Sequence, residues 1–127
     1  MTFSPDLALA YVRELSADYR EGVILDAHGA VLSGDERLAR AAREIAPGEA
    51  DGGVAEAFEG VSDRGKVFAA RSLTHLIAIT TGPFALSRVV HRDLLTALAG
   101  MGDESAQGTR PQWIPHGTVE ALLDPSD

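Results

Sequence analysis

The sequence has no cysteine and no long apolar run, and each absence excludes a class of protein. Without cysteine there is no disulfide, no thiolate nucleophile and no thiolate-ligated zinc or iron–sulfur centre. No run approaches the ~20 apolar residues that a membrane-spanning helix needs. The first residues, MTFSPDLALAYVRE, lack the basic start and long apolar middle of a secretory signal, so we expect a cytosolic protein.

Positive charge is also scarce, because 11 Lys and Arg stand against 19 Asp and Glu, which makes the formal net charge −8 at pH 7. Binding to phosphate backbones depends on clustered basic side chains that release counterions. We therefore expect neither nucleic acid nor an anionic membrane as a partner. The length of 127 residues suits one compact domain, and the hydrophobic content of 45% is that of an ordinary globular protein.

The N-terminal part of the chain has the patterns of a helix followed by a hairpin. Ser4, Pro5 and Asp6 begin the helix: the hydroxyl caps it, the proline suits its first turn, and the acid lies at the positive end of its dipole. Two short apolar runs, at residues 23–25 and 30–32, then flank Asp-Ala-His-Gly. Turn-forming residues around a glycine predict a tight hairpin there.

A second helix is expected over residues 36–45, with either Ser33 and Glu36 as a capping box or Asp35 as the cap. One face of this helix is apolar and unusually rich in alanine. That face consists of Leu38, Ala41, Ala42 and Ile45. Small side chains allow a close approach, so we expect the helix to pack tightly either against a sheet or against a copy of itself.

Three further strands and a third helix are predicted after a loop. The strands are expected at residues 54–58, 66–71 and 75–81, and the helix at 85–99. The last strand, HLIAITT, is apolar on both faces, which is typical of a central strand. We therefore predict an α+β domain over residues 1–101, in the order α-β-β-α-β-β-β-α, with a five-stranded, mostly antiparallel sheet and helices on both faces. A flexible tail, residues 102–127, ends in a short helix.

Two short stretches imitate nucleotide-handling motifs without completing them. HRDL, at residues 91–94, matches the start of a protein-kinase catalytic loop, but that loop needs an Asn where this chain has Leu98. GVSDRGKV, at residues 60–67, matches a phosphate-binding loop except at its last position, where valine lacks the hydroxyl that holds magnesium. We interpret the first stretch as an amphipathic helix and the second as a hairpin turn.

No other pattern points to catalysis, a cofactor or a metal. The four histidines are not spaced as metal ligands, and the G-x-S-x-G surroundings of a serine nucleophile are absent. We therefore expect a protein that is not an enzyme and needs no cofactor.

Two residues have two interpretations each. Asp93 falls within the apolar face of the third helix, so we expect it either to pair with an arginine or to contact a partner. Trp113, the only tryptophan, lies between prolines in RPQWIPHG. It either covers an exposed edge of the core or serves as a docking anchor for another chain.

With these elements placed, the chain from about Leu7 to Leu98 resembles the roadblock / dynein-light-chain domain family, particularly its bacterial MglB-like members. The resemblance rests on the hairpin GVILDAHGAVLSG with its Asp-x-x-Gly turn, the alanine-rich helix, the strand HLIAITTG and the closing helix PFALSRVVHRDLLTAL. It implies a five-stranded antiparallel sheet with one helical layer on one face and the second helix on the other. It also implies a homodimer formed through the second helices and the edge strand that follows them. Those elements place the interface at Leu38, Ala41, Ala42, Ile45, Val54 and Phe58.

The function that the resemblance implies is non-enzymatic binding of a small Ras-like GTPase. Such proteins are platforms that modulate or localise the GTPase, and in bacteria they accompany sensor-kinase-like proteins. We therefore expect a homodimeric regulator or scaffold in bacterial signalling. The alternative is a small-molecule sensor of PAS or GAF type, because the Asp-x-x-Gly hairpin also occurs in those folds; such a sensor needs an apolar cavity.

Overall fold

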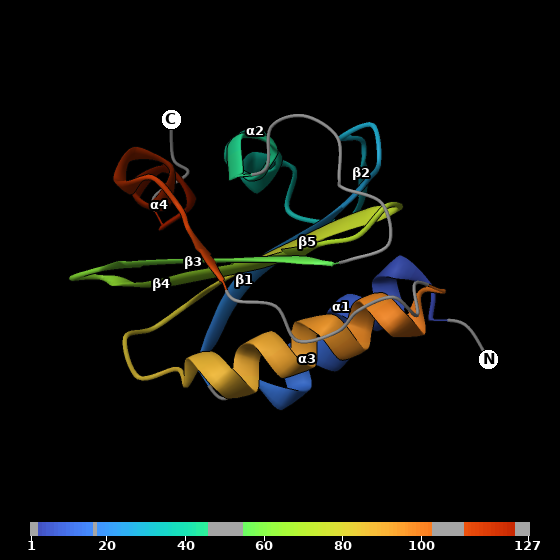
Figure 1. The fold of residues 1–127 in the computed structure, drawn as a ribbon, viewed down its shortest axis with the longest axis horizontal. Coiled ribbons are helices and arrows are strands. Elements are labelled where there is room, and N and C mark those ends of the chain that lie inside the picture. The colour runs from blue at the N-terminus through green and yellow to red at the C-terminus, as the bar shows by residue number, and fades with distance from the viewer. Residues whose placement is uncertain (1–2, 17, 46–54, 103–110, 124–127) are drawn as a thin grey trace.

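The computed structural model describes residues 3–16, 18–45, 55–102 and 111–123. In these ranges the chain forms a mixed sheet between two helical layers (Figure 1), which confirms the predicted α+β class. The helices are α1 (Pro5–Leu15), α2 (Glu36–Ile45), α3 (Ser87–Gly100) and α4 (His116–Leu123). The strands are β1 (Tyr19–Asp26), β2 (Val31–Gly34), β3 (Glu56–Ser62), β4 (Gly65–Arg71), β5 (His75–Thr81) and β6 (Gln112–Trp113).

The sheet has six strands in the order β2-β1-β5-β4-β3-β6, so the prediction of five strands was wrong. The additional strand is β6, which pairs with β3 in parallel, whereas the other neighbouring strands are antiparallel. β6 has only two residues, and Pro111 and Pro115 lie on either side of it. Two residues are too few to show the alternation of a strand, which is why the sequence did not reveal it.

β5 lies at the centre of the sheet, as its two apolar faces predicted. Ile77 and Ile79 pack in the core formed with α1 and α3, whereas Leu76 and Ala78 pack in the core formed with α2 and α4. Figure 1 shows α1 and α3 on one side of the sheet and α2 and α4 on the other. The second helix therefore shares its layer with α4, which the resemblance did not imply.

The predicted hairpin between β1 and β2 is confirmed. Oδ1 of Asp26 accepts hydrogen bonds from the backbone N–H groups of His28 and Ala30, at 2.8 and 3.0 Å. Both hydrogen bonds lower the pKa of the Asp26 carboxyl below its usual value, and the bond from Ala30 has the larger effect. Gly29 has a φ of 85°, a left-handed conformation that glycine adopts without a steric penalty. The turn is thus specified by residues that are neighbours in the sequence.

The stretch at residues 60–67 forms the hairpin between β3 and β4, as predicted, with Ser62 paired to Gly65. β3 consequently ends at Ser62, further along the chain than the strand predicted at 54–58. Alternation could not place it, because the strand contains acids that find partners only in the fold. Glu56, for example, accepts a hydrogen bond of 2.8 Å from the guanidinium of Arg71 on β4.

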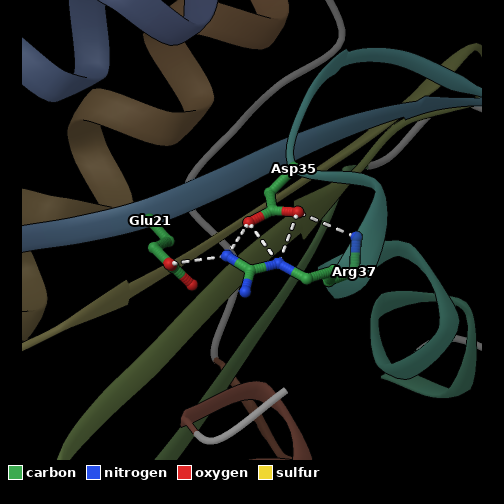
Figure 2. Close-up of polar contacts among 3 residues, drawn as sticks. All are labelled: Glu21, Asp35 and Arg37. Atoms are coloured by element: carbon green, nitrogen blue, oxygen red, sulfur yellow. Dashed lines mark hydrogen bonds and ion pairs between the residues drawn. The ribbon is translucent and has the colours of Figure 1, made fainter. Parts of the chain in front are cut away.

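The cap of α2 is Asp35. Its Oδ1 accepts a hydrogen bond of 2.9 Å from the backbone N–H of Arg37, and both carboxylate oxygens bind the Arg37 guanidinium (Figure 2). The guanidinium also lies 3.6 Å from Oε1 of Glu21 on β1. Ser33, the alternative cap, instead donates its hydroxyl to Asp6 on α1. The contact between Arg37 and Glu21 therefore links the start of α2 to β1.

Replacing Asp35 with alanine is expected to lower the free energy of unfolding by about 1 kcal/mol, the usual cost of losing a cap side chain. Hydrogen bonds from the Arg37 side chain, and then from its backbone N–H, hold the pKa of Asp35 below its usual value. The stabilisation is therefore present above the unfolded pKa and is lost as the pH falls through the folded pKa. Urea unfolding measures it, with Asp35→Asn as the control that keeps the cap acceptor without the charge. Equal stability of Asp35→Ala and the wild type at neutral pH would contradict this assignment of the cap.

Candidate functional site

The face predicted to form a homodimer is covered by the chain itself. Leu38, Ala41, Ala42 and Ile45 on α2, and Phe58 on β3, are 0 to 7% exposed and belong to the core on this side of the sheet. Val54, also predicted there, lies outside the described residues. The alanine-rich face of α2 thus packs against the sheet, one of its two expected arrangements. A second copy can reach this face only if part of the chain moves.

Residues 111–123 also cover this face of α2. We call them the C-terminal segment, and they contain β6 and α4. Its side chains Ile114, Val119 and Leu122 are buried in the same core as the face of α2. β6 lies along the outer edge of β3, and the backbone N–H of Ile114 donates to the carbonyl of Glu59 at 2.9 Å. The tail predicted over residues 102–127 therefore includes a folded part, while residues 103–110 and 124–127 lie outside the described ranges.

Three polar side chains, which we call the polar cluster, join β3 to the start of α3. Oγ of Ser87 donates to Oε2 of Glu59 at 2.9 Å, and Nε2 of His91 lies 3.2 Å from Oε1 of the same carboxylate. The imidazole also meets the ring of Phe68 edge to face, with ring centroids 5.3 Å apart. An ionised carboxylate only accepts hydrogen bonds, so we assign the proton of neutral His91 to Nε2.

The polar cluster has the residue types of a Ser-His-acid triad but not its connectivity. In a triad the imidazole lies between the hydroxyl and the acid and takes the hydroxyl proton. Here Glu59 lies between Ser87 and His91, and the Ser87 hydroxyl donates to the carboxylate. The Ser87 hydroxyl therefore donates to the carboxylate rather than to the imidazole, to which the nucleophile of a triad would donate. Its effect is to hold the first turn of α3 on the sheet.

Burial lowers the pKa of His91 below its usual value, while the hydrogen bond and the charge of Glu59 act in the opposite direction. The Nδ1 atom of His91 is buried and has no hydrogen-bond partner among the described residues. A proton added to Nδ1 would become an unsatisfied buried donor, which costs free energy. Protonation of His91 therefore opposes the folded state.

We expect the free energy of unfolding to fall as the pH is lowered through about 6.5, the usual pKa of histidine. In that range unfolded His91 takes up a proton and folded His91 does not, so acid stabilises the unfolded chain by at most about 1.4 kcal/mol per pH unit. Urea unfolding of the wild type and His91→Gln between about pH 5 and 7.5 measures the effect. Gln keeps an amide donor for Glu59 and does not titrate, so the stability difference should depend on pH. A constant difference would show that His91 makes no such contribution.

Beside the polar cluster, the loop between β5 and α3 presents large apolar side chains to solvent. Phe84 is 85% exposed and Leu86 is 70% exposed. The backbone of this loop is nevertheless held: the N–H of Phe84 donates to Oδ2 of Asp18 at 3.1 Å, and the carbonyl of Ala85 accepts from the ammonium of Lys66 at 2.9 Å. The two apolar side chains therefore project from an anchored backbone.

Two more exposed apolar residues lie on the neighbouring strands. Trp113 is 74% exposed and is paired with Glu59, which binds the start of α3. Val61 is exposed and is paired with Lys66, which binds the loop. In-register neighbours project to the same face of a sheet, so Trp113 and Val61 face the side that carries α3. We call Val61, Phe84, Leu86 and Trp113 the anchor patch.

Sequence reasoning singled out one member of the anchor patch, Trp113. The C-terminal segment does fold back onto the sheet, but the Trp113 side chain stays in solvent. Leu86 was missed because the third helix was predicted to begin at residue 85, whereas it begins at Ser87, and Phe84 was assigned no role in the sequence. The available signal was Gly-Pro directly before Phe84, which is typical of a loop.

Asp93 is the most unusual side chain of α3, because it is 4% exposed within an apolar face. Its Oδ2 has no hydrogen-bond partner among the described residues, and its Oδ1 lies 3.8 Å from Nε of the exposed Arg92. The predicted pairing with an arginine is present only as this long contact. Burial raises the pKa of Asp93 above its usual value, while the charge of Arg92 acts to lower it.

Within the described ranges, no group of three His, Asp or Glu side chains is placed to hold a metal ion, and none of the helices has the length and apolarity to cross a membrane. Comparison with protein-family models, curated proteins and solved structures finds no match to this chain. The interpretation of the site therefore depends on its geometry and on the resemblance noted in the sequence.

Proposed function

We propose that this chain is a non-enzymatic protein-binding module, a homodimeric regulator or scaffold for a small Ras-like GTPase. The observation that supports it most is the anchor patch. Phe84 and Trp113 are of residue types that are enriched at protein interfaces, and both are exposed, as are Leu86 and Val61. A group of large exposed apolar side chains on a folded domain marks a contact with another protein.

The anchor patch is preorganised for binding. Lys66 and Asp18 hold the loop backbone, and Glu59 holds Ser87 and His91 at the start of α3. A partner would bury apolar side chains without first ordering this backbone, which lowers the entropic cost of association. The polar cluster supports binding by positioning the patch, since its connectivity does not suit nucleophilic catalysis.

The choice of a GTPase as the partner comes from the resemblance to the roadblock family. A platform needs no nucleotide chemistry of its own, because the GTPase holds the nucleotide. A preorganised binding surface suits a platform of this kind, which binds the GTPase and leaves the nucleotide chemistry to it. A sensor-kinase-like protein remains a second proposed partner in bacterial signalling.

Binding is tested by titrating the small Ras-like GTPases of the same organism, loaded with GDP or with a GTP analogue, onto the immobilised chain. We expect one of them to bind in a nucleotide-dependent manner. The double variant Phe84→Ser/Leu86→Ser should weaken binding by at least about 30-fold, because a single interface hot spot contributes about 2 kcal/mol or more. Trp113→Ser tests the third anchor separately.

The matched control is Leu73→Ser, which removes an exposed leucine from the turn between β4 and β5. That turn lies at one end of β4, and Lys66 lies at the other end. Lys66 is paired with Thr81, the last residue of β5 before the loop that carries Phe84 and Leu86, so the control position is distant from the anchor patch. The control should bind as the wild type does. If no GTPase binds in either nucleotide state, the proposed partner is wrong. If the double variant binds as tightly as the control, the anchor patch is not the contact.

A further inference from the structure

The C-terminal segment contacts the domain through one strand and one helix. β6 pairs with the outer edge of β3, with Phe58 opposite Gln112 and Glu59 opposite Trp113. α4 lies against α2, β3 and β4 (Figure 1). These are the two elements, the edge strand and the second helix, that the predicted homodimer would use. The segment therefore occupies the surface that a second copy was expected to take.

The surface under the segment is shaped to receive it. A Cβ atom at Gly60 would collide with the side chain of Val119 and lie 3.2 Å from Ile114. The absence of a side chain at this point of β3 is what allows α4 to lie directly on the strand. Arg64, in the turn after β3, forms an ion pair with Glu120 of α4. Apolar fit and charge together define one position for the segment.

We propose that this surface also accepts the C-terminal segment of a second copy, so that two chains exchange residues 111–123 and form a homodimer. Exchange requires no new complementarity, because each chain makes between molecules the contacts that the structure shows within one molecule. The residues that join the segment to α3, DESAQGTR at 103–110, include no large apolar side chain. The proposed occupant is therefore the C-terminal segment of a second copy, because the structure shows that this segment fits this surface.

Exchange makes the anchor patch a composite of two chains. Trp113 belongs to the segment, whereas Val61, Phe84 and Leu86 belong to the domain. Each patch of the exchanged dimer would combine Trp113 of one chain with the other three residues of its partner. This inference rests on the homodimer part of the proposed function and deepens it. Exchange would allow two chains to form a dimer although the predicted dimer face is covered in a single chain.

Two variants with complementary defects test the exchange. Gly60→Val blocks the surface, because the new side chain occupies the place of Val119. Val119→Asp damages the segment, because docking it would bury an unpaired charge. Neither variant can dock its own segment. In an equimolar mixture, however, the intact segment of the Gly60→Val chain can dock on the intact surface of the Val119→Asp chain.

Sedimentation equilibrium should show the wild type as a homodimer, each variant alone as a monomer and the mixture as a one-to-one heterodimer, and a monomeric wild type would overturn the proposal. Circular dichroism establishes that each variant is folded. A mixture that stays monomeric although both variants are folded would overturn the proposal. The GTPase titration is a separate measurement, so the loss of the exchange model would leave the test of GTPase binding intact.

A second experiment avoids damaged surfaces and covers the case in which either variant fails to fold. Arg64→Cys and Glu120→Cys are introduced into separate chains, each of which then has a single thiol because the natural sequence has none. Exchange brings these two positions together between chains, so a short bismaleimide should link them, with a yield that rises with protein concentration. Leu73→Cys paired with Glu120→Cys is the control, and its yield should stay low. Equal yields for the two pairs would refute the exchange.

Discussion

Replacing Phe68 with alanine should lower the free energy of unfolding by about 3 to 5 kcal/mol, a large share of the total stability of a domain of this size. Phe68 lies on β4, is fully buried and is among the largest side chains of the core shared with α1 and α3. Its ring fills a volume that alanine would leave empty, and the close-packed interior relaxes only in part around such a gap.

The same substitution has a second expected effect, on His91. The Phe68 ring shields the imidazole, and burial is the main reason that the pKa of His91 is lowered. Without the ring, water reaches the imidazole, so its pKa should rise toward the usual value and the loss of stability in acid should become smaller. Urea unfolding at several pH values measures both effects. Phe68→Leu is the control, because it keeps most of the volume and should cost much less. A Phe68→Ala protein as stable as Phe68→Leu would contradict the assigned packing.

Replacing Asp93 with leucine should instead raise the free energy of unfolding, by about 1 to 3 kcal/mol at neutral pH. The carboxylate is buried among apolar neighbours on α3, and its Oδ2 is unsatisfied within the described structure. Leucine removes the desolvation cost and suits the apolar face. Asp93→Asn should give a smaller gain, because the amide removes the charge but leaves polar atoms without partners.

The gain from Asp93→Leu should also depend on pH. Burial raises the folded pKa of Asp93, so at pH values between the unfolded and the folded pKa the folded chain binds a proton that the unfolded chain does not. The cost of the carboxylate is therefore complete above the folded pKa and disappears as the pH falls below the unfolded one. Thermal or urea unfolding at neutral and acidic pH tests this, with Arg88→Ala, an exposed position on the same helix, as a control that should change little. A gain independent of pH would show that packing alone, and not charge, is responsible.

The parts of the fold that sequence reasoning placed well are those decided by neighbouring residues. Ser4 caps α1 by accepting a hydrogen bond of 3.1 Å from the N–H of Leu7, as the Ser-Pro-Asp start predicted. The turn after Asp26 closes through its own carboxylate. β5 has the predicted bounds, His75–Thr81, because a strand covered on both faces has an uninterrupted apolar pattern.

The candidate site was predicted less well, because its members come from distant parts of the chain. Glu59 meets Ser87 and His91 only after β3 and α3 are packed together, and no local spacing links them. The exposure of Leu86 depends on where α3 begins, which an apolar pattern that continues through Leu86 conceals. Trp113 alone could be singled out, by its rarity and its flanking prolines.

By itself, the sequence determined the α+β class, the first hairpin, the central strand and the apolar face of α2, because hydrogen bonds between neighbours and the period of side chains along an element are local. Only the tertiary structure decided what covers that face and which apolar side chains remain in solvent. Both outcomes depend on β6 and α4 returning to β3 and α2, across a long separation in sequence. The fit of Val119 over Gly60 is a property of two surfaces brought together, and neither residue signals it alone.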